Sequence, residues 1–281
     1  MQFGPIVRMS ASIAVLSVMD AVIKGMAAYY PVFQVAFLRF LCGSVIAVGA
    51  ACILRPGWPS RETVVANSMR AVVAVVTALS FFYALSQLPL AETLLLSFLA
   101  PMFIALLGVI MLKERVDGRI LAALAMGFAG TLVVVFGQSG EEAGARSIPG
   151  VAAALASALT YALSIVLLRS RAQRDKFMHI VLFQNLGPMV LSLPLAVWVW
   201  QSVRLEHLPW FALMGALGFA GHMLMVSAYA KAPAARLAPL EYTALIWAAL
   251  IGFGVFSEVP TWATAVGGVL IVAAAFMTSR R

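Results

Sequence analysis

Long apolar stretches dominate this 281-residue chain and follow one another with only short polar breaks. A helix needs about 20 predominantly apolar residues to cross the hydrocarbon core of a bilayer. Ten stretches meet this requirement, at about residues 6–28, 32–54, 66–87, 90–112, 119–137, 149–169, 178–201, 209–230, 235–257 and 261–278. Because 63% of the residues are hydrophobic and only 11% are charged, far from the composition of soluble domains, we predict an all-α integral membrane protein with ten transmembrane helices.

The 19 basic residues gather in alternate breaks between the apolar stretches. With the N-terminus inside, the cytoplasmic positions are Arg8, Arg55, Arg61, Arg70, Lys113, Arg115, Arg119, Arg169, Arg171, Arg174, Lys176, Lys231, Arg236, Arg280 and Arg281. Only Arg146 and Arg204 fall outside, and Lys24 and Arg39 lie within spans. This bias follows the positive-inside rule and predicts that both termini are cytoplasmic. It accounts for the net charge of +8 without a nucleic-acid partner.

Motifs of enzymes and of cofactor sites are absent from the sequence. It contains no H-E-x-x-H, no phosphate-binding loop, no C-x-x-C and no G-x-G-x-x-G. Cys42 and Cys52 lie on one predicted helix about 15 Å apart, too far for a disulfide. The breaks are also too short to hold a soluble catalytic domain. We therefore predict no catalytic residue, no metal and no cofactor.

The two halves of the chain align with each other after a shift of 144 residues. In one register the shift pairs Pro89 with Pro233, Gly108 with Gly252 and Glu114 with Glu258. Because each half holds five helices, an odd number, the halves must enter the membrane in opposite directions. We expect inverted repeats at residues 1–137 and 149–281, joined by an outer linker at 138–148. Such repeats place a solute site near the midplane and work by alternating access.

Residues 83–135 and 238–277 resemble the second part of an EamA-type repeat of the drug/metabolite transporter superfamily. The most specific shared element is a glutamate after the fourth and ninth predicted helices, Glu114 and Glu258, followed by a helix that carries glycine. The resemblance implies a ten-helix carrier of small organic solutes in the inner membrane, with a central cavity and both termini inside. Such carriers often export amino acids or related metabolites. The chain departs from the pattern at Asp20, where many relatives have an apolar or aromatic residue.

Three charged residues fall inside the first two predicted helices. Asp20 and Lys24 share one helix face at positions i and i+4, and Arg39 lies at a matching depth, each roughly 10 to 12 Å from the outer ends. An unpaired charge at a helix centre costs about 2.5 to 3.5 kcal/mol, so exposure to lipid is unfavourable. In one interpretation Lys24 or Arg39 holds a solute carboxylate, with Asp20 as a proton site or amine partner. In the other, the three charges form a structural network that locks the two helices.

Polar side chains also line the third and sixth predicted helices. The stripe on the third includes Thr77, Ser80 and Tyr83, and that on the sixth includes Ser157, Thr160, Tyr161 and Ser164. Two stripes in corresponding helices favour a wet cavity, although hydroxyl groups also bond across packed helices.

The last candidate residues lie on the seventh to ninth predicted helices. Asn185 precedes Gly187 and Pro188, which predicts a broken helix of the kind that builds solute sites, or a kink satisfied by neighbours. His222 follows Gly215 and Gly218 on a face where small residues permit close helix approach; it is either structural or a ligand. Near Pro239, Glu241 supplies charge or pairs with Arg236, while Tyr242 and Trp247 supply aromatic surface.

Small residues repeat four apart on the fifth and tenth predicted helices, at Ala123 and Gly127 and at Ala263 and Gly267. They predict helix packing, either between the repeats or between the protomers of a homodimer.

Together these features predict a multi-pass inner-membrane exporter of small metabolites, chiefly amino acids, including aromatic ones, or related amphiphilic solutes. One alternative is an uptake carrier for a metabolite such as a nucleoside derivative. An alternative of another class is a membrane-embedded enzyme that uses Asp20, His222 or Glu241 as acid or base. The predicted cavity residues are Asp20, Lys24, Arg39, Ser80, Tyr83, Tyr161, Ser164, Asn185, His222, Tyr242 and Trp247.

Overall fold

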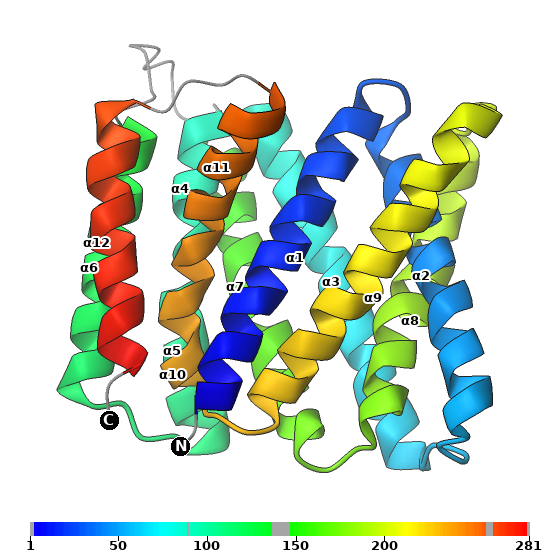
Figure 1. Ribbon diagram of the computed structural model, residues 1–281, viewed down its shortest axis with the longest axis horizontal. Coiled ribbons are helices and arrows are strands. Elements are labelled where there is room, and N and C mark those ends of the chain that lie inside the picture. The colour runs from blue at the N-terminus through cyan, green and yellow to red at the C-terminus, as the bar shows by residue number, and fades with distance from the viewer. Residues whose placement is uncertain (1–2, 89, 137–146, 257–260, 280–281) are drawn as a thin grey trace. The chain divides into compact units, whose positions relative to one another are not determined.

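The computed structural model describes residues 3–88, 90–136, 147–256 and 261–279. These residues form helices joined by short loops, with no strand among them (Figure 1). The longer helices are α1 (Phe3–Ala27), α2 (Val32–Leu54), α3 (Arg61–Gln87), α6 (Gly118–Phe136), α7 (Ile148–Ala172), α8 (Phe177–Trp198), α9 (Leu208–Tyr229) and α12 (Trp262–Ser279). In the described part of the chain eight helical segments are long and apolar enough to cross a membrane: seven of these helices, all except α12, and the segment Ala234–Val255. Ala100–Leu112 and Trp262–Met277 are shorter apolar helices. The all-helical, membrane-spanning character predicted from the apolar stretches is confirmed.

The fourth and ninth predicted helices are interrupted, whereas the sequence predicted continuous ones. The fourth consists of α4 (Leu90–Ser97) and α5 (Ala100–Leu112), and the ninth consists of α10 (Ala234–Leu237), the 3₁₀ helix η2 (Ala238–Thr243) and α11 (Ala244–Phe256). A proline lies at the start of the segment that follows each break. Pro101 is in the first turn of α5, and Pro239 is in the first turn of η2. Proline lacks an N–H and its ring clashes with the preceding turn, which ends a regular helix there.

The seventh predicted helix is not broken, contrary to the expectation from Gly187 and Pro188. Helix α8 runs without interruption from Phe177 to Trp198 with Pro188 and Pro194 inside it. Asn185 Nδ2 donates to the carbonyl of Val181 at 2.9 Å, so the amide is satisfied within its own helix.

The chain folds as two compact units. Unit 1 comprises the described residues of 1–6, 76–167 and 232–281, and unit 2 comprises residues 7–75 and 168–231. Each unit combines segments from both halves of the sequence. The expected outer linker, 138–148, lies almost wholly outside the described residues, as does Glu258.

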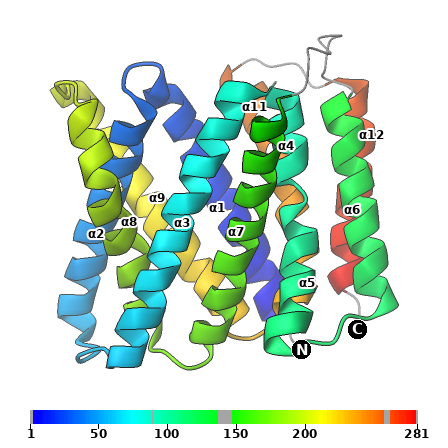
Figure 2. The same ribbon diagram turned by 180° about the vertical axis from the view of Figure 1, so that it is seen from behind.

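In unit 1 the helices α6 and α12 pack along each other, as both views show (Figures 1 and 2). A Cβ on Gly130 would lie 2.8 Å from the carbonyl oxygen of Gly267, and one on Gly267 would lie 2.5 Å from the carbonyl oxygen of Gly130. Gly127 packs against the ring of Tyr242. The packing role predicted for Gly127 and Gly267 is confirmed, and Gly130 adds a contact that the sequence analysis did not name. A homodimer through the same faces is not supported, because they are filled within one chain.

In unit 2 the helix α2 lies beside α8 and α9 (Figures 1 and 2). Gly215 and Gly221 of α9 allow the neighbouring helices to approach closely. A Cβ on Gly215 would lie 2.5 Å from Cys42 Cβ on α2, and one on Gly221 would lie 2.6 Å from Leu16 on α1. Ser12 Oγ also donates to the Gly221 carbonyl at 2.8 Å. The close helix approach predicted for this face of α9 is therefore confirmed.

Candidate functional site

Arg39 lies where three helices of unit 2 meet. Its Nε donates to Met19 Sδ on α1 at 2.9 Å, and its guanidinium lies 4.4 Å from the centre of the Phe40 ring. A Cβ on Gly218 of α9 would lie 3.4 Å from both Nε and Nη2 of Arg39. The absence of a side chain at Gly218 thus leaves room for this arginine inside the unit.

Asp20 is an exposed residue of α1 whose charge acts on Arg39. It lies seven residues before the end of α1, and Arg39 lies seven residues after the start of α2, so both are about 10 Å from the turn that joins these helices. The two charges act on each other electrostatically. Lys24, one turn farther along α1, is exposed. Asp20 and Arg39 therefore lie at similar distances from the α1–α2 turn, and their role in solute binding stays a prediction.

His222 lies on α9, one turn after Gly218. Its Nδ1 is 2.6 Å from the Gly218 carbonyl oxygen. Because a carbonyl only accepts, Nδ1 carries a proton, and in the uncharged tautomer that this bond requires Nε2 is an acceptor. The charges of Arg39 and Arg70 both act on this ring. His222 therefore shares an electrostatic environment with Arg39.

Arg70 lies deeper in its helix than the sequence predicted when it assigned this residue to the cytoplasmic face. Arg70 lies inside α3, nine residues after its first residue, Arg61, and so about 13 Å from that end. It is only 3% exposed, and its Nε has no hydrogen-bond partner among the described residues. The polar residues Arg61, Glu62 and Thr63 hid the true start of the helix, and the predicted span began at residue 66.

In unit 1 the hydroxyl stripes bond to each other across α3 and α7. Thr77 Oγ1 donates to Thr160 Oγ1 at 2.9 Å, and Ser157 Oγ donates to the Thr77 carbonyl at 3.1 Å. Thr77, Ser157 and Thr160 therefore bond across two packed helices, which was the alternative to a wet cavity. Ser80 is half-buried, Tyr83 is exposed and Ser164 is buried.

The interrupted ninth helix brings Glu241 to the sixth predicted helix, α7. Tyr161 OH donates to Glu241 Oε2 at 3.2 Å. The next residue, Tyr242, is fully buried, stacks on Phe98 at 6.2 Å between ring centres, and has no hydrogen-bond partner for its hydroxyl among the described residues. Trp247 on α11 is half-buried. The 3₁₀ turn therefore carries one hydrogen-bonded carboxylate and one buried aromatic side chain.

Glu114 binds the start of the same interrupted helix. Its Oε1 accepts from the backbone N–H of Ala234 at 3.0 Å, and its Oε2 accepts from that of Ala235 at 3.1 Å. A carboxylate satisfies the free N–H groups at a helix start. This contact gives the glutamate after the fourth predicted helix a structural role at α10.

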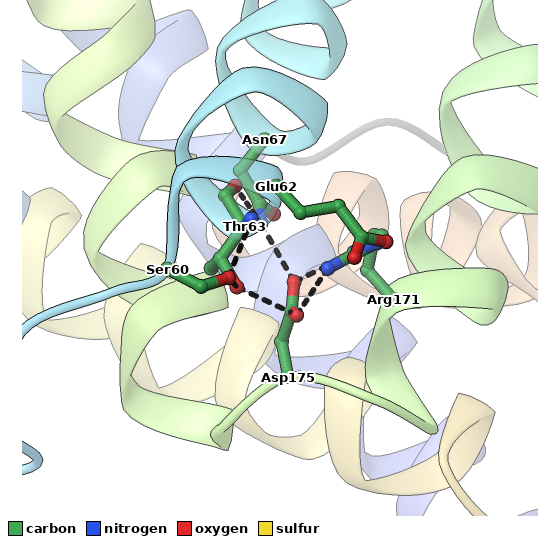
Figure 3. A network of polar contacts seen from close by, with 6 residues as sticks. All are labelled: Ser60, Glu62, Thr63, Asn67, Arg171 and Asp175. Carbon is green, nitrogen blue, oxygen red and sulfur yellow. Dashed lines mark hydrogen bonds and ion pairs between the residues drawn. The ribbon is translucent and has the colours of Figure 1, made fainter.

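A polar network in unit 2 was missed by the sequence analysis (Figure 3). Asp175, in the loop between α7 and α8, accepts from Thr63 Oγ1 at 2.9 Å, from Asn67 Nδ2 at 3.0 Å and from Arg171 Nε at 2.7 Å. Arg171 also pairs with Glu62 at 2.5 Å. Burial raises the pKa of the Asp175 carboxyl, but the hydrogen bonds from Arg171, Thr63 and Asn67 outweigh this and hold it below its usual range.

Two further bonds tie the same loops together. Lys176 Nζ donates to the Pro56 carbonyl at 2.6 Å, and His179 Nε2 lies 3.0 Å from the Gly57 carbonyl oxygen. These contacts and the network around Asp175 fasten the α2–α3 connection to the α7–α8 connection. No sequence motif marks the partners, because they lie more than 100 residues apart in the chain.

A cavity of about 410 Å³ lies between α6, α11 and α12 of unit 1. Its lining is almost entirely apolar, with Thr264 as the one polar side chain among the residues that form it. It lacks the charges that a polar solute needs, so the ionisable residues of unit 2 remain the stronger candidate site. The described residues contain no cluster of three side chains suited to hold a metal ion.

The chain is similar to known membrane transporters. The model of the EamA-like transporter family matches residues 5–136 and again residues 148–280. A pseudopaline exporter of Pseudomonas aeruginosa is 27% identical over 268 residues, which cover 94% of this chain and 92% of the exporter. An S-adenosylmethionine uptake transporter of Rickettsia bellii is 23% identical over 242 residues, 86% of this chain and 81% of that transporter. One crystal structure aligns with a TM-score of 0.84 at 23% identity, covering 99% of both chains.

These relatives are named as transporters rather than enzymes, which confirms that the chain is not an enzyme. The family and the apolar helices also confirm a multi-pass protein of the inner membrane that acts on small-molecule solutes. Because its family model matches both halves of the sequence, this chain belongs to the EamA-like transporter family.

Proposed function

We propose that this transporter exports small metabolites, amino acids (including aromatic ones) or related amphiphilic solutes, by alternating access through a central cavity. In this proposal the chain crosses the membrane ten times as two inverted five-helix repeats, residues 1–137 and 149–281, with both termini in the cytoplasm. The pairs α4–α5 and α10–α11 each make one crossing. The two family matches and the interrupted helix in each half support this arrangement, because discontinuous helices in repeated halves are typical of secondary transporters.

The observation that carries the proposal is the pair of opposite charges on membrane-spanning helices of unit 2. Asp20 and Arg39 act on each other electrostatically at matching depth, beside the glycine face of α9. Ionisable residues inside spans are expensive and usually functional. A carboxylate and a guanidinium are also the partners that the ammonium and carboxylate groups of an amino acid require.

The other predicted cavity residues stay part of the proposal. Lys24 is a second cation on the face of Asp20, and His222 offers an acceptor near Arg39. Hydroxyl, amide and aromatic groups for the rest of the solute would come from Ser80, Tyr83, Tyr161, Ser164, Asn185, Tyr242 and Trp247.

Uptake is a second candidate direction. It is favoured by the similarity to S-adenosylmethionine uptake transporters of Rickettsia bellii and Rickettsia prowazekii. The similarity to a pseudopaline exporter favours export. Direction is decided by comparing efflux and uptake of one solute in cells that overexpress the protein.

Purified protein in liposomes tests the proposal. Radiolabelled amino acids, nucleosides and organic cations are offered one at a time, with and without a pH gradient, against liposomes that contain Asp20→Asn. We expect accumulation of at least one amino acid by the wild-type protein and less by the variant. If no amino acid moves under any gradient, the assignment of the solute class is wrong. If Asp20→Asn keeps the full response to pH, Asp20 is not the proton site.

A further inference from the structure

Arg70 is a buried cation that nothing in unit 2 neutralises. It is 3% exposed, it lies about 13 Å inside α3, and its Nε has no hydrogen-bond partner in the described chain. A buried charge without a partner is strongly unfavourable. An anionic ligand bound to the guanidinium would offset this cost.

All residues of unit 2 are described, so its carboxylates can be accounted for. Asp20 acts on Arg39. Asp175 is bound by Arg171, Thr63 and Asn67, and Glu62 pairs with Arg171. The remaining carboxylate, Glu206, lies 3.6 Å from Arg204. Each acid therefore has another partner, and none acts on Arg70.

His222 lies within electrostatic range of Arg70, whose charge acts on its ring together with that of Arg39. His222 lies seven residues before the end of α9, or about 10 Å from that end. The two residues thus lie at similar depth, toward the end of unit 2 that holds the α2–α3 connection. Because His222 Nδ1 is committed to the Gly218 carbonyl, Nε2 is left as an acceptor for an N–H group.

We propose that Arg70 is a solute-binding residue that holds an anionic group, a carboxylate in the first instance, with His222 Nε2 beside it as an acceptor. A guanidinium offers several N–H donors in one plane and binds a carboxylate through two parallel hydrogen bonds. The arrangement suits a solute that carries a carboxylate and an N–H donor close together. This inference rests on the proposed transport function and adds a binding residue to it.

The transport test uses pairs of probes that differ only in the carboxylate. Phenylalanine and phenylalaninamide, and methionine and methioninamide, are offered to liposomes with wild-type protein, Arg70→Gln, Arg70→Lys and the control Arg174→Gln, which changes an exposed arginine. We expect Arg70→Gln to lower carboxylate transport about tenfold or more, with partial recovery in Arg70→Lys. Carboxamide transport and the control should change less than about twofold. Unchanged carboxylate transport in Arg70→Gln overturns the proposal.

A stability test separates binding from a structural role and from failure of the proposed function. The melting temperature of the detergent-purified protein is measured in sodium acetate, in sodium chloride, and in acetamide with sodium chloride added to the same ionic strength. We expect acetate to raise the wild-type value above that in chloride and to have no such effect on Arg70→Gln, which without solute should melt no lower than wild type. This result supports the anion site even where the liposomes move no amino acid, in which case only the proposed function fails. If Arg70→Gln melts at a lower temperature than the wild-type protein without solute, Arg70 has a structural role. If the wild-type protein melts at the same temperature in sodium chloride as in sodium acetate, the site is one for inorganic anions. Either result overturns the proposal.

Discussion

Asp175 should be the residue whose loss most weakens the connection between the α2–α3 and α7–α8 loops. Its side chain is 3% exposed and accepts hydrogen bonds from Thr63, Asn67 and Arg171. In Asp175→Ala these donors lose their acceptor inside the protein. A hydrogen bond to a charged group contributes about 1.5 to 3 kcal/mol, and breaking a buried ion pair costs about 3 to 5 kcal/mol.

The cost at this site should fall at the lower end of that range. Arg171 keeps Glu62 as a partner, and Asn67 keeps its bond to the Thr63 carbonyl, so neither is left wholly unsatisfied. We therefore expect Asp175→Ala to lower the free energy of unfolding by about 3 kcal/mol. For a chain of this size about 2 °C corresponds to each kcal/mol, which gives a shift of about 6 °C.

Glu62→Ala is the matched control because it removes the other carboxylate bound to Arg171. The Glu62 side chain is 70% exposed, so its ion pair should contribute less than about 1 kcal/mol. Thermal unfolding of both purified variants, followed by intrinsic fluorescence, should place Asp175→Ala several degrees below Glu62→Ala. Equal melting temperatures would refute the importance assigned to burial in this network.

Three further predictions concern the stability of the purified protein. Folding lowers the pKa of Asp175 from an unfolded value of 3.8. The contribution of the Asp175 carboxylate to the stability of the folded protein is therefore fully present above that pH and is lost as the pH falls through the lower folded pKa. The difference in melting temperature between wild type and Asp175→Asn should shrink below about pH 4. Gly215→Ala should lower stability by about 1 to 3 kcal/mol because the new Cβ meets backbone and side-chain atoms of α2, whereas Gly49→Ala, with open space around it, should raise it by about 0.5 to 1 kcal/mol; equal effects in thermal unfolding would contradict the packing argument. Glu114→Ala should cost about 1 kcal/mol through loss of the cap on α10, and unchanged thermal unfolding would show that water replaces the carboxylate.

Apolar length and charge bias were enough to predict the helices, because a bilayer leaves few alternatives for a run of about 20 apolar residues. They could not locate the interruptions at Phe98–Leu99 and at η2. Prolines also occur inside continuous helices, as Pro188 does in α8. Whether a proline breaks a helix depends on which neighbours satisfy the freed backbone groups, and these neighbours come from distant parts of the chain.

The sequence predicted contacts between residues that are close in the chain and missed contacts between distant ones. The tight α1–α2 turn predicted that Asp20 and Arg39 lie at one depth, and in the structure their charges act on each other. Arg70 was misplaced because the polar residues before it resemble a loop. Asp175 was overlooked because its partners Thr63 and Asn67 lie more than 100 residues away in the sequence.

The ionisable groups inside unit 2 follow one another along the helix axes, and His222 lies within the series. Asp20 and Arg39 lie about 10 Å from the α1–α2 turn, whereas Arg70 and His222 lie about 10 to 13 Å from the opposite helix ends. Arg39 reaches the α9 backbone at Gly218, and the carbonyl of Gly218 accepts from His222 one turn farther along. The charges of Arg39 and Arg70 both act on the His222 ring. A solute carboxylate that reaches His222 would therefore come under the influence of both arginines, so His222 connects the Asp20 and Arg39 end of the series to Arg70.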